Sequence, residues 1–158
     1  MSYRNALVLL IISWTTALSA EEPVMGPVID GYGPNYFVDE RDVPLPEGFV
    51  YKTVFDIGQD PEPDEVNRYL VTVARFLNMH ARNGVLPDDM NLAIVVHGAA
   101  TRNLVKADNN PNLQLLGKLQ EAGVRVYLCG QSMVHSGIRK DELASGVQVG
   151  LSAMTLLT

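Results

Sequence analysis

The residue of this sequence with the most reactive side chain is its single cysteine, Cys129. It follows an apolar run at 124–128 and precedes Gly130, which would let the backbone turn sharply. If residues 131–136 form a helical turn, free N–H groups would lie near the sulfur and favour its thiolate. A reactive thiol and an inert, buried cysteine are equally consistent with this spacing. One cysteine allows neither an internal disulfide nor a Cys-x-x-Cys pair.

A histidine occupies the equivalent place after the preceding apolar run, because His97 follows residues 92–96. If the two runs are neighbouring parallel strands, about 4.8 Å apart, His97 could hold or shuttle a proton for Cys129. A histidine satisfied by backbone hydrogen bonds at a strand end is the alternative. The sequence thus suggests a catalytic pair, Cys129 and His97, beside a substrate or anion pocket formed by Gly98, Gly130, Gln131 and Ser132.

Other polar residues nearby favour less specific roles. Arg102 and Lys106 could add positive potential for an anionic ligand, but the pattern favours a solvated helix face for both. A metal site of Cys129, His97 and His135 is conceivable, yet none of these pairs has the spacing of a metal motif. We therefore expect no metal and no cofactor. Serine-hydrolase and phosphate-loop motifs are missing from the sequence.

The segments that must position these residues alternate between strand and helix patterns. Apolar and β-branched runs predict strands at 50–57, 92–96, 124–128 and 147–149. Helical spacing predicts one helix from the DPEPDEV segment to Gly84, a second from Asn110-Pro111 to Gly123, and a last one at 150–157. This alternation predicts right-handed βαβ crossovers and a mostly parallel sheet.

The chain divides into three parts. Residues 1–20 have the pattern of a secretory signal peptide, with Arg4, an apolar run and small residues near a cleavage site at Ser19-Ala20. We therefore expect a periplasmic or secreted protein with no membrane span in its mature form. Residues 21–49 form a Pro/Gly-rich arm whose apolar residues predict packing on a surface, its own or a neighbour's. Residues 50–158 form the α/β domain.

Composition excludes some classes of protein. Of 158 residues, 47% are apolar and 19% charged, which is typical of a folded domain and not of disorder. The net charge is −6 and no basic cluster is present, so the sequence gives no support for nucleic-acid binding.

The motifs VHGAAT, a helix opening with NPN, and GVRVYLCGQS occur in this order. With GPVIDGYGP, FDIG and GVQVGLSAMTLLT, they make residues 26–158 resemble the DsrE/DsrF-like family, in its exported, periplasmic branch. The resemblance implies a three-layer α/β/α sandwich with a mostly parallel sheet of four or five strands. It also implies a homo-oligomer, a trimer or hexamer, and a cysteine after the third strand that carries sulfur as a persulfide. Cys129 matches that cysteine, and His97 matches a residue typical of the exported branch, with no assigned role.

The function that the resemblance implies is sulfur handling in the cell envelope, with a thiol or sulfur-donor protein as partner. The alternatives are a non-catalytic oligomeric module that binds a ligand or senses thiol redox state, and a structural domain with an inert cysteine. Export separates this chain from the cytoplasmic relay partners of the family. The sequence also lacks the usual last strand, so we expect a sheet one edge strand short or completed by a neighbour.

Overall fold

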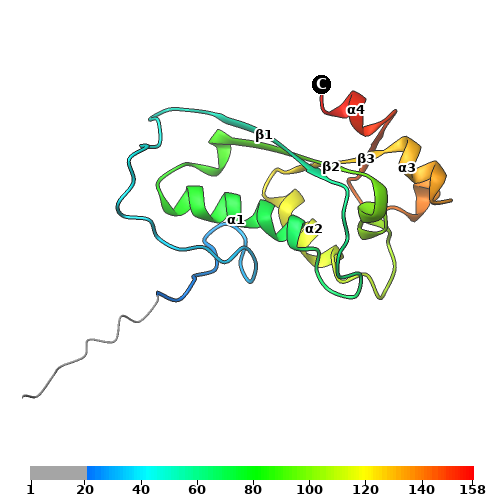
Figure 1. Ribbon diagram of the computed structural model, residues 1–158, viewed down its shortest axis with the longest axis horizontal. Coiled ribbons are helices and arrows are strands. Elements are labelled where there is room, and N and C mark those ends of the chain that lie inside the picture. The colour runs from blue at the N-terminus through cyan, green and yellow to red at the C-terminus, as the bar shows by residue number, and fades with distance from the viewer. Residues whose placement is uncertain (1–20) are drawn as a thin grey trace, which may run out of the picture.

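A computed structural model describes residues 21–158, and the predicted signal peptide at 1–20 lies outside the described residues. The fold is built on one parallel sheet in the order β1-β2-β3-β4 (Figure 1). Its strands are β1 (Tyr51–Ile57), β2 (Met90–Val96), β3 (Arg125–Cys129) and β4 (Gln148–Gly150). The predicted α/β fold with a parallel sheet is confirmed.

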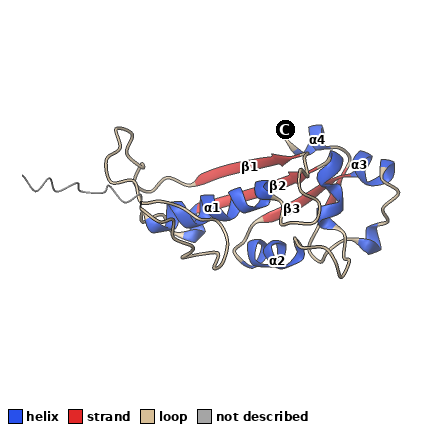
Figure 2. Ribbon diagram, turned by 60° about the horizontal axis from the view of Figure 1, so that its bottom comes forward, coloured by secondary structure: helices blue, strands red, loops and turns tan. Residues whose placement is uncertain are grey.

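Helices cover the two faces of the sheet unequally. The long helices α1 (Arg68–Arg82) and α2 (Leu113–Glu121) lie side by side on one face (Figure 2). The short helix α4 (Ala153–Leu156) lies on the other face, against β2, β3 and β4. These are the three layers of the sandwich. The remaining helical segments are η1 (Pro87–Asp89), η2 (Gly98–Leu104), α3 (Gly130–His135) and η3 (Lys140–Glu142).

The burial pattern of each strand reflects this unequal cover by helices. In β2 the residues Leu92 to Val96 are all buried, because helices pack on both of its faces. In β1, by contrast, burial alternates along the strand. Its helix-facing residues pack on the core, whereas Lys52, Val54 and Asp56 are exposed on the other face.

Both long helices begin later than predicted. The helix expected from the DPEPDEV segment starts at Arg68, where the Asn67 side chain caps it by accepting from the Tyr69 N–H at 2.9 Å. The helix expected from Asn110-Pro111 starts at Leu113. The Asn67 cap explains the start of α1. Asn112 makes no such cap for α2, but its Oδ1 accepts from the Asn67 N–H at 2.8 Å and joins the two helix ends. The last helix is confined to Ala153–Leu156 within the predicted 150–157.

The arm at 21–49 packs on the helical layer of its own chain. Asn78 of α1 is fully buried and bonds to the backbone of Val28, Ile29 and Tyr32. Gly33 lies so close to the backbone of Arg75 that a Cβ atom would have no room. The structure thus shows the arm packed on a surface of its own chain, the first of the two predicted surfaces, where it covers the helices. Within residues 21–158 every helix is too short or too polar to cross a membrane.

Candidate functional site

The carboxyl ends of β2 and β3 bring two of the predicted residues to adjacent backbone positions. Val96 of β2 is in register with Leu128 of β3; His97 directly follows β2, and Cys129 is the last residue of β3. Because the strands are parallel, both residues lie at the same edge of the sheet. The sequence predicted this juxtaposition from the two apolar runs alone.

Cys129 ends β3, precedes α3 and is 5% exposed. Burial alone would raise the pKa of its thiol, and it is the largest single influence. Hydrogen bonding from the Ser132 hydroxyl and from the N–H groups of Ser132, Ala153 and Gln131 acts in the opposite direction. Together these donors prevail and lower the pKa of Cys129, which favours the thiolate. The sulfur is therefore buried but surrounded by groups that stabilise its negative charge.

Ala153 is a contributor that the sequence analysis missed. It is the first residue of α4, whose N-terminus approaches Cys129 from the face of the sheet opposite the long helices. The predicted helix at 150–157 was a signal that such an N-terminus existed. Its direction depends on how the chain returns from β4, which local sequence does not encode.

The predicted pocket residues are partly brought together. The Gly98 N–H donates to Ser132 Oγ at 3.1 Å, which links the end of β2 to α3 beside Cys129. Gly130 packs against the Gly150 carbonyl, and a Cβ atom there would clash with it. Gln131 is exposed, and its Nε2 lies 3.5 Å from the Leu151 carbonyl. A hollow of about 560 Å³ opens beside these residues, lined by Gly98, Ala99, Gln131, Ser132, His135 and Ser136.

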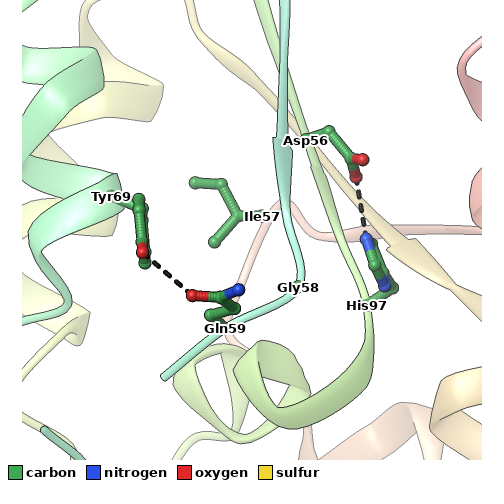
Figure 3. Close-up of a pocket in the computed structure, with 6 residues that line it drawn as sticks. All are labelled: Asp56, Ile57, Gly58, Gln59, Tyr69 and His97. Carbon is green, nitrogen blue, oxygen red and sulfur yellow. Dashed lines mark hydrogen bonds and ion pairs between the residues drawn. The ribbon is translucent and has the colours of Figure 1, made fainter. Parts of the chain in front are cut away.

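The His97 ring turns away from the cysteine strand. Its Nε2 lies 2.9 Å from Asp56 Oδ1 of β1, and the ring covers the Cα atom of Gly58. Figure 3 shows the imidazole beneath the Asp56 carboxylate, on one side of the β1 end. In the described chain, His97 thus bonds to Asp56 and not to Cys129. Asp56 was missed by the sequence analysis, although its outward place in the alternating β1 pattern was a usable signal.

A second pocket of about 360 Å³ surrounds the end of β1. It is lined by Asp56, Ile57, Gly58, Gln59, Tyr69 and His97 (Figure 3). The Tyr69 hydroxyl donates to Gln59 Oε1 at 2.9 Å on the far side of the strand from His97. The carboxyl edge of the sheet therefore holds two hollows, one beside Ser132 and one beside the Asp56–His97 pair.

Buried polar groups fix the loop that follows β1. The Asp60 carboxylate is fully buried and accepts from Arg102 Nε at 2.6 Å and from Asn103 Nδ2 at 2.9 Å. Asn103 Oδ1 in turn accepts from Asn67 Nδ2 at 2.8 Å. Arg102 is therefore an ion-pair partner of Asp60, and η2, which follows His97, is held in place.

The other predicted positive or metal-binding side chains are not gathered at Cys129. His135 lines the hollow beside Ser132 and is exposed. Lys106 is exposed after η2, and its N–H donates to the Glu142 carbonyl at 2.7 Å. Across residues 21–158, no group of three or more His, Cys, Asp or Glu side chains is arranged to hold a metal ion.

The fold and this edge define a class of protein: a parallel α/β sandwich with a cysteine at the carboxyl end of its third strand. The family profile described as "DsrE/DsrF-like family" matches residues 52–158. The chain belongs to the DsrE/DsrF-like family.

The fold is shared with solved structures. One of them is the protein of unknown function MTH1491 from Methanobacterium thermoautotrophicum, at 24% sequence identity and a TM-score of 0.55. The match covers 68% of this chain and 87% of that chain. No curated protein matches the sequence significantly.

Proposed function

We propose that the protein handles sulfane sulfur in the cell envelope, with Cys129 as the carrier. The thiolate attacks the outer sulfur of a donor, a new S–S bond forms, and the donor's leaving group departs with the electron pair of the broken bond. An acceptor thiolate then attacks the terminal sulfur of the persulfide and releases the Cys129 thiolate. The observation that supports this proposal is the set of hydrogen-bond donors around a lone thiol at the sheet edge.

The surrounding residues have separate roles in this proposal. The Ser132 hydroxyl and the N–H groups near the sulfur stabilise the charge on thiolate and persulfide. The hollow beside Ser132 admits the donor. His97 bonds to Asp56, so it serves the second pocket, and a direct proton transfer to Cys129 would require its ring to rotate. The signal-peptide pattern supports a periplasmic or secreted location, and the resemblance supports a homo-oligomer with a thiol or sulfur-donor protein as partner.

A second candidate function is thiol redox sensing without turnover. The observation that favours it is the 5% exposure of Cys129, since a small oxidant reaches such a sulfur more easily than a protein donor does. In that case the thiolate would be oxidised reversibly to a sulfenic acid, and no sulfur would be transferred.

Intact mass spectrometry separates these functions. The protein is treated with polysulfide in one sample and with hydrogen peroxide in another, and Cys129→Ser is the control for both. Sulfur carriage predicts a gain of sulfur mass that an added thiol removes. Redox sensing predicts oxygen addition with peroxide but no stable gain of sulfur. If folded protein gains neither, while denatured protein reacts, Cys129 is an inert core residue.

A further inference from the structure

The edge strand β1 has a row of backbone groups that β2 does not use. The His97 N–H donates to the Ile57 carbonyl at 3.0 Å, so Ile57 faces β2, and so do the odd-numbered residues before it. The N–H and C=O groups of Lys52, Val54 and Asp56 therefore point outward. Within residues 21–158 β1 pairs with β2 alone, and its outer edge is open.

The side chains of these three residues form a self-complementary pattern. Lys52 and Asp56 stand two residues to either side of Val54, on the sheet face opposite the long helices. Val54 is 48% exposed although it is apolar. A two-fold axis through Val54 exchanges the positions of the positive and negative charges. We propose that a second copy of this chain pairs with β1, strand against strand and antiparallel, across such an axis.

Hydrogen bonding permits a register centred on Val54, and charge selects it over its neighbours. With Val54 opposite the partner's Val54, the outward groups of all three residues meet outward groups of the second copy, as an antiparallel ladder requires. Lys52 then lies opposite the partner's Asp56, and each charge has an opposite neighbour about 4.5–5.5 Å away at Cβ. Registers centred on Lys52 or Asp56 place like charges opposite each other. Registers centred on Thr53 or Phe55 leave each charge opposite an uncharged residue, a valine or Gly58.

The charge of Lys52 favours a second copy of β1 as the partner strand. A lysine on an edge strand ordinarily discourages pairing with other chains. Only a strand with an acidic residue at the matching place relieves that penalty, and a second β1 provides it twice.

The pairing would complete the second pocket. Asp56 already bonds to His97 at 2.9 Å, and the partner's Lys52 would join this pair from the next strand. The two sheets would form one continuous sheet. The assembly would contain an even number of subunits, such as a dimer or a hexamer, because every β1 edge needs one partner. This inference does not depend on the chemistry of Cys129.

Disulfide trapping tests the register. In a Cys129→Ser background, Val54→Cys would place two thiols opposite each other, at a Cα separation of about 5.5 Å that a disulfide can bridge. The matched control is Asn91→Cys, an exposed position of β2 on the same sheet face but away from the axis. Mild oxidation followed by a non-reducing gel should yield a covalent dimer for Val54→Cys and monomer for Asn91→Cys. Equal cross-linking of the two variants would overturn the pairing.

Charge exchange gives an independent test by light scattering. The wild type should be an even-numbered oligomer at micromolar concentration, and Lys52→Asp should dissociate it, with circular dichroism confirming the fold. The double variant Lys52→Asp with Asp56→Lys restores opposite charges in the proposed register and should reassociate. A monomeric or trimeric wild type, or a double variant as dissociated as the single one, contradicts the proposal.

Discussion

Asn78 is expected to hold the N-terminal arm on the domain, and its replacement by alanine should release that arm. The side chain is fully buried. Its Oδ1 accepts from the N–H groups of Val28 and Ile29 at 3.0 and 2.7 Å, and its Nδ2 donates to the carbonyls of Ile29 and Tyr32 at 3.0 and 2.8 Å. With a longer bond from Nδ2 to the Gly33 carbonyl at 3.4 Å, one amide group contacts five backbone groups far away in the sequence.

The expected loss in the free energy of unfolding follows from these hydrogen bonds. A typical intramolecular hydrogen bond contributes about 1 kcal/mol net, and a buried group left without a partner costs about 1–3 kcal/mol. Water can reach part of the arm once it loosens, so the full sum is not lost. We expect Asn78→Ala to lower the free energy of unfolding by about 3 kcal/mol.

Urea denaturation measures the loss, and limited proteolysis should show earlier cleavage within residues 21–35. Thr72→Ala is the matched control on the same helix, since its exposed hydroxyl bonds only to the Arg68 carbonyl within α1. A loss below about 0.5 kcal/mol for Asn78→Ala, within the usual range for surface substitutions, would refute this account of the arm.

Three further predictions concern the carboxyl ends of the strands. Ser132→Ala removes a hydrogen bond to the thiolate, and hydrogen bonds to charged groups contribute about 1.5–3 kcal/mol. Iodoacetamide labelling of Cys129 at neutral pH should therefore slow about tenfold or more, with Ser136→Ala as the control. An unchanged rate would exclude Ser132 as a stabiliser of the thiolate. Because the folded-state pKa of Cys129 is lowered, the thiolate contributes stability that is present above the unfolded pKa of about 8.5 and lost as pH falls through the folded pKa. The difference in unfolding free energy between wild type and Cys129→Ser should therefore grow with pH, and a flat difference would contradict the shift. Gly58→Ala should push the His97 ring off Asp56, cost about 1 kcal/mol, and shift the imidazole NMR signals; unchanged signals would count against the packing seen here.

Much of the fold could be predicted from local pattern. The apolar run before His97 identified a strand buried on both faces, and Gly123 marked the end of the second helix. The positions of His97 and Cys129 at one sheet edge followed as well, because parallel strands with alternating helices place all carboxyl ends together. These features depend on periodicity and chain order, which are properties of the sequence itself.

The interactions of the site were decided by tertiary structure. The direction of the His97 ring depends on Asp56, which lies on another strand, and on the room that Gly58 leaves for it. The Ala153 N–H reaches Cys129 only because the chain turns back over the sheet after β4.

The start of α1 is the clearest case. The prolines and acidic residues before it favour a first turn locally, yet the helix begins at Arg68. There Asn67 caps it, and the Asn67 N–H is held by the Asn112 side chain from a distant segment of the chain. Local preferences of this kind contribute a few tenths of a kcal/mol to about 1 kcal/mol each. Buried polar contacts between segments contribute as much or more, and which side chains they join depends on the folded backbone.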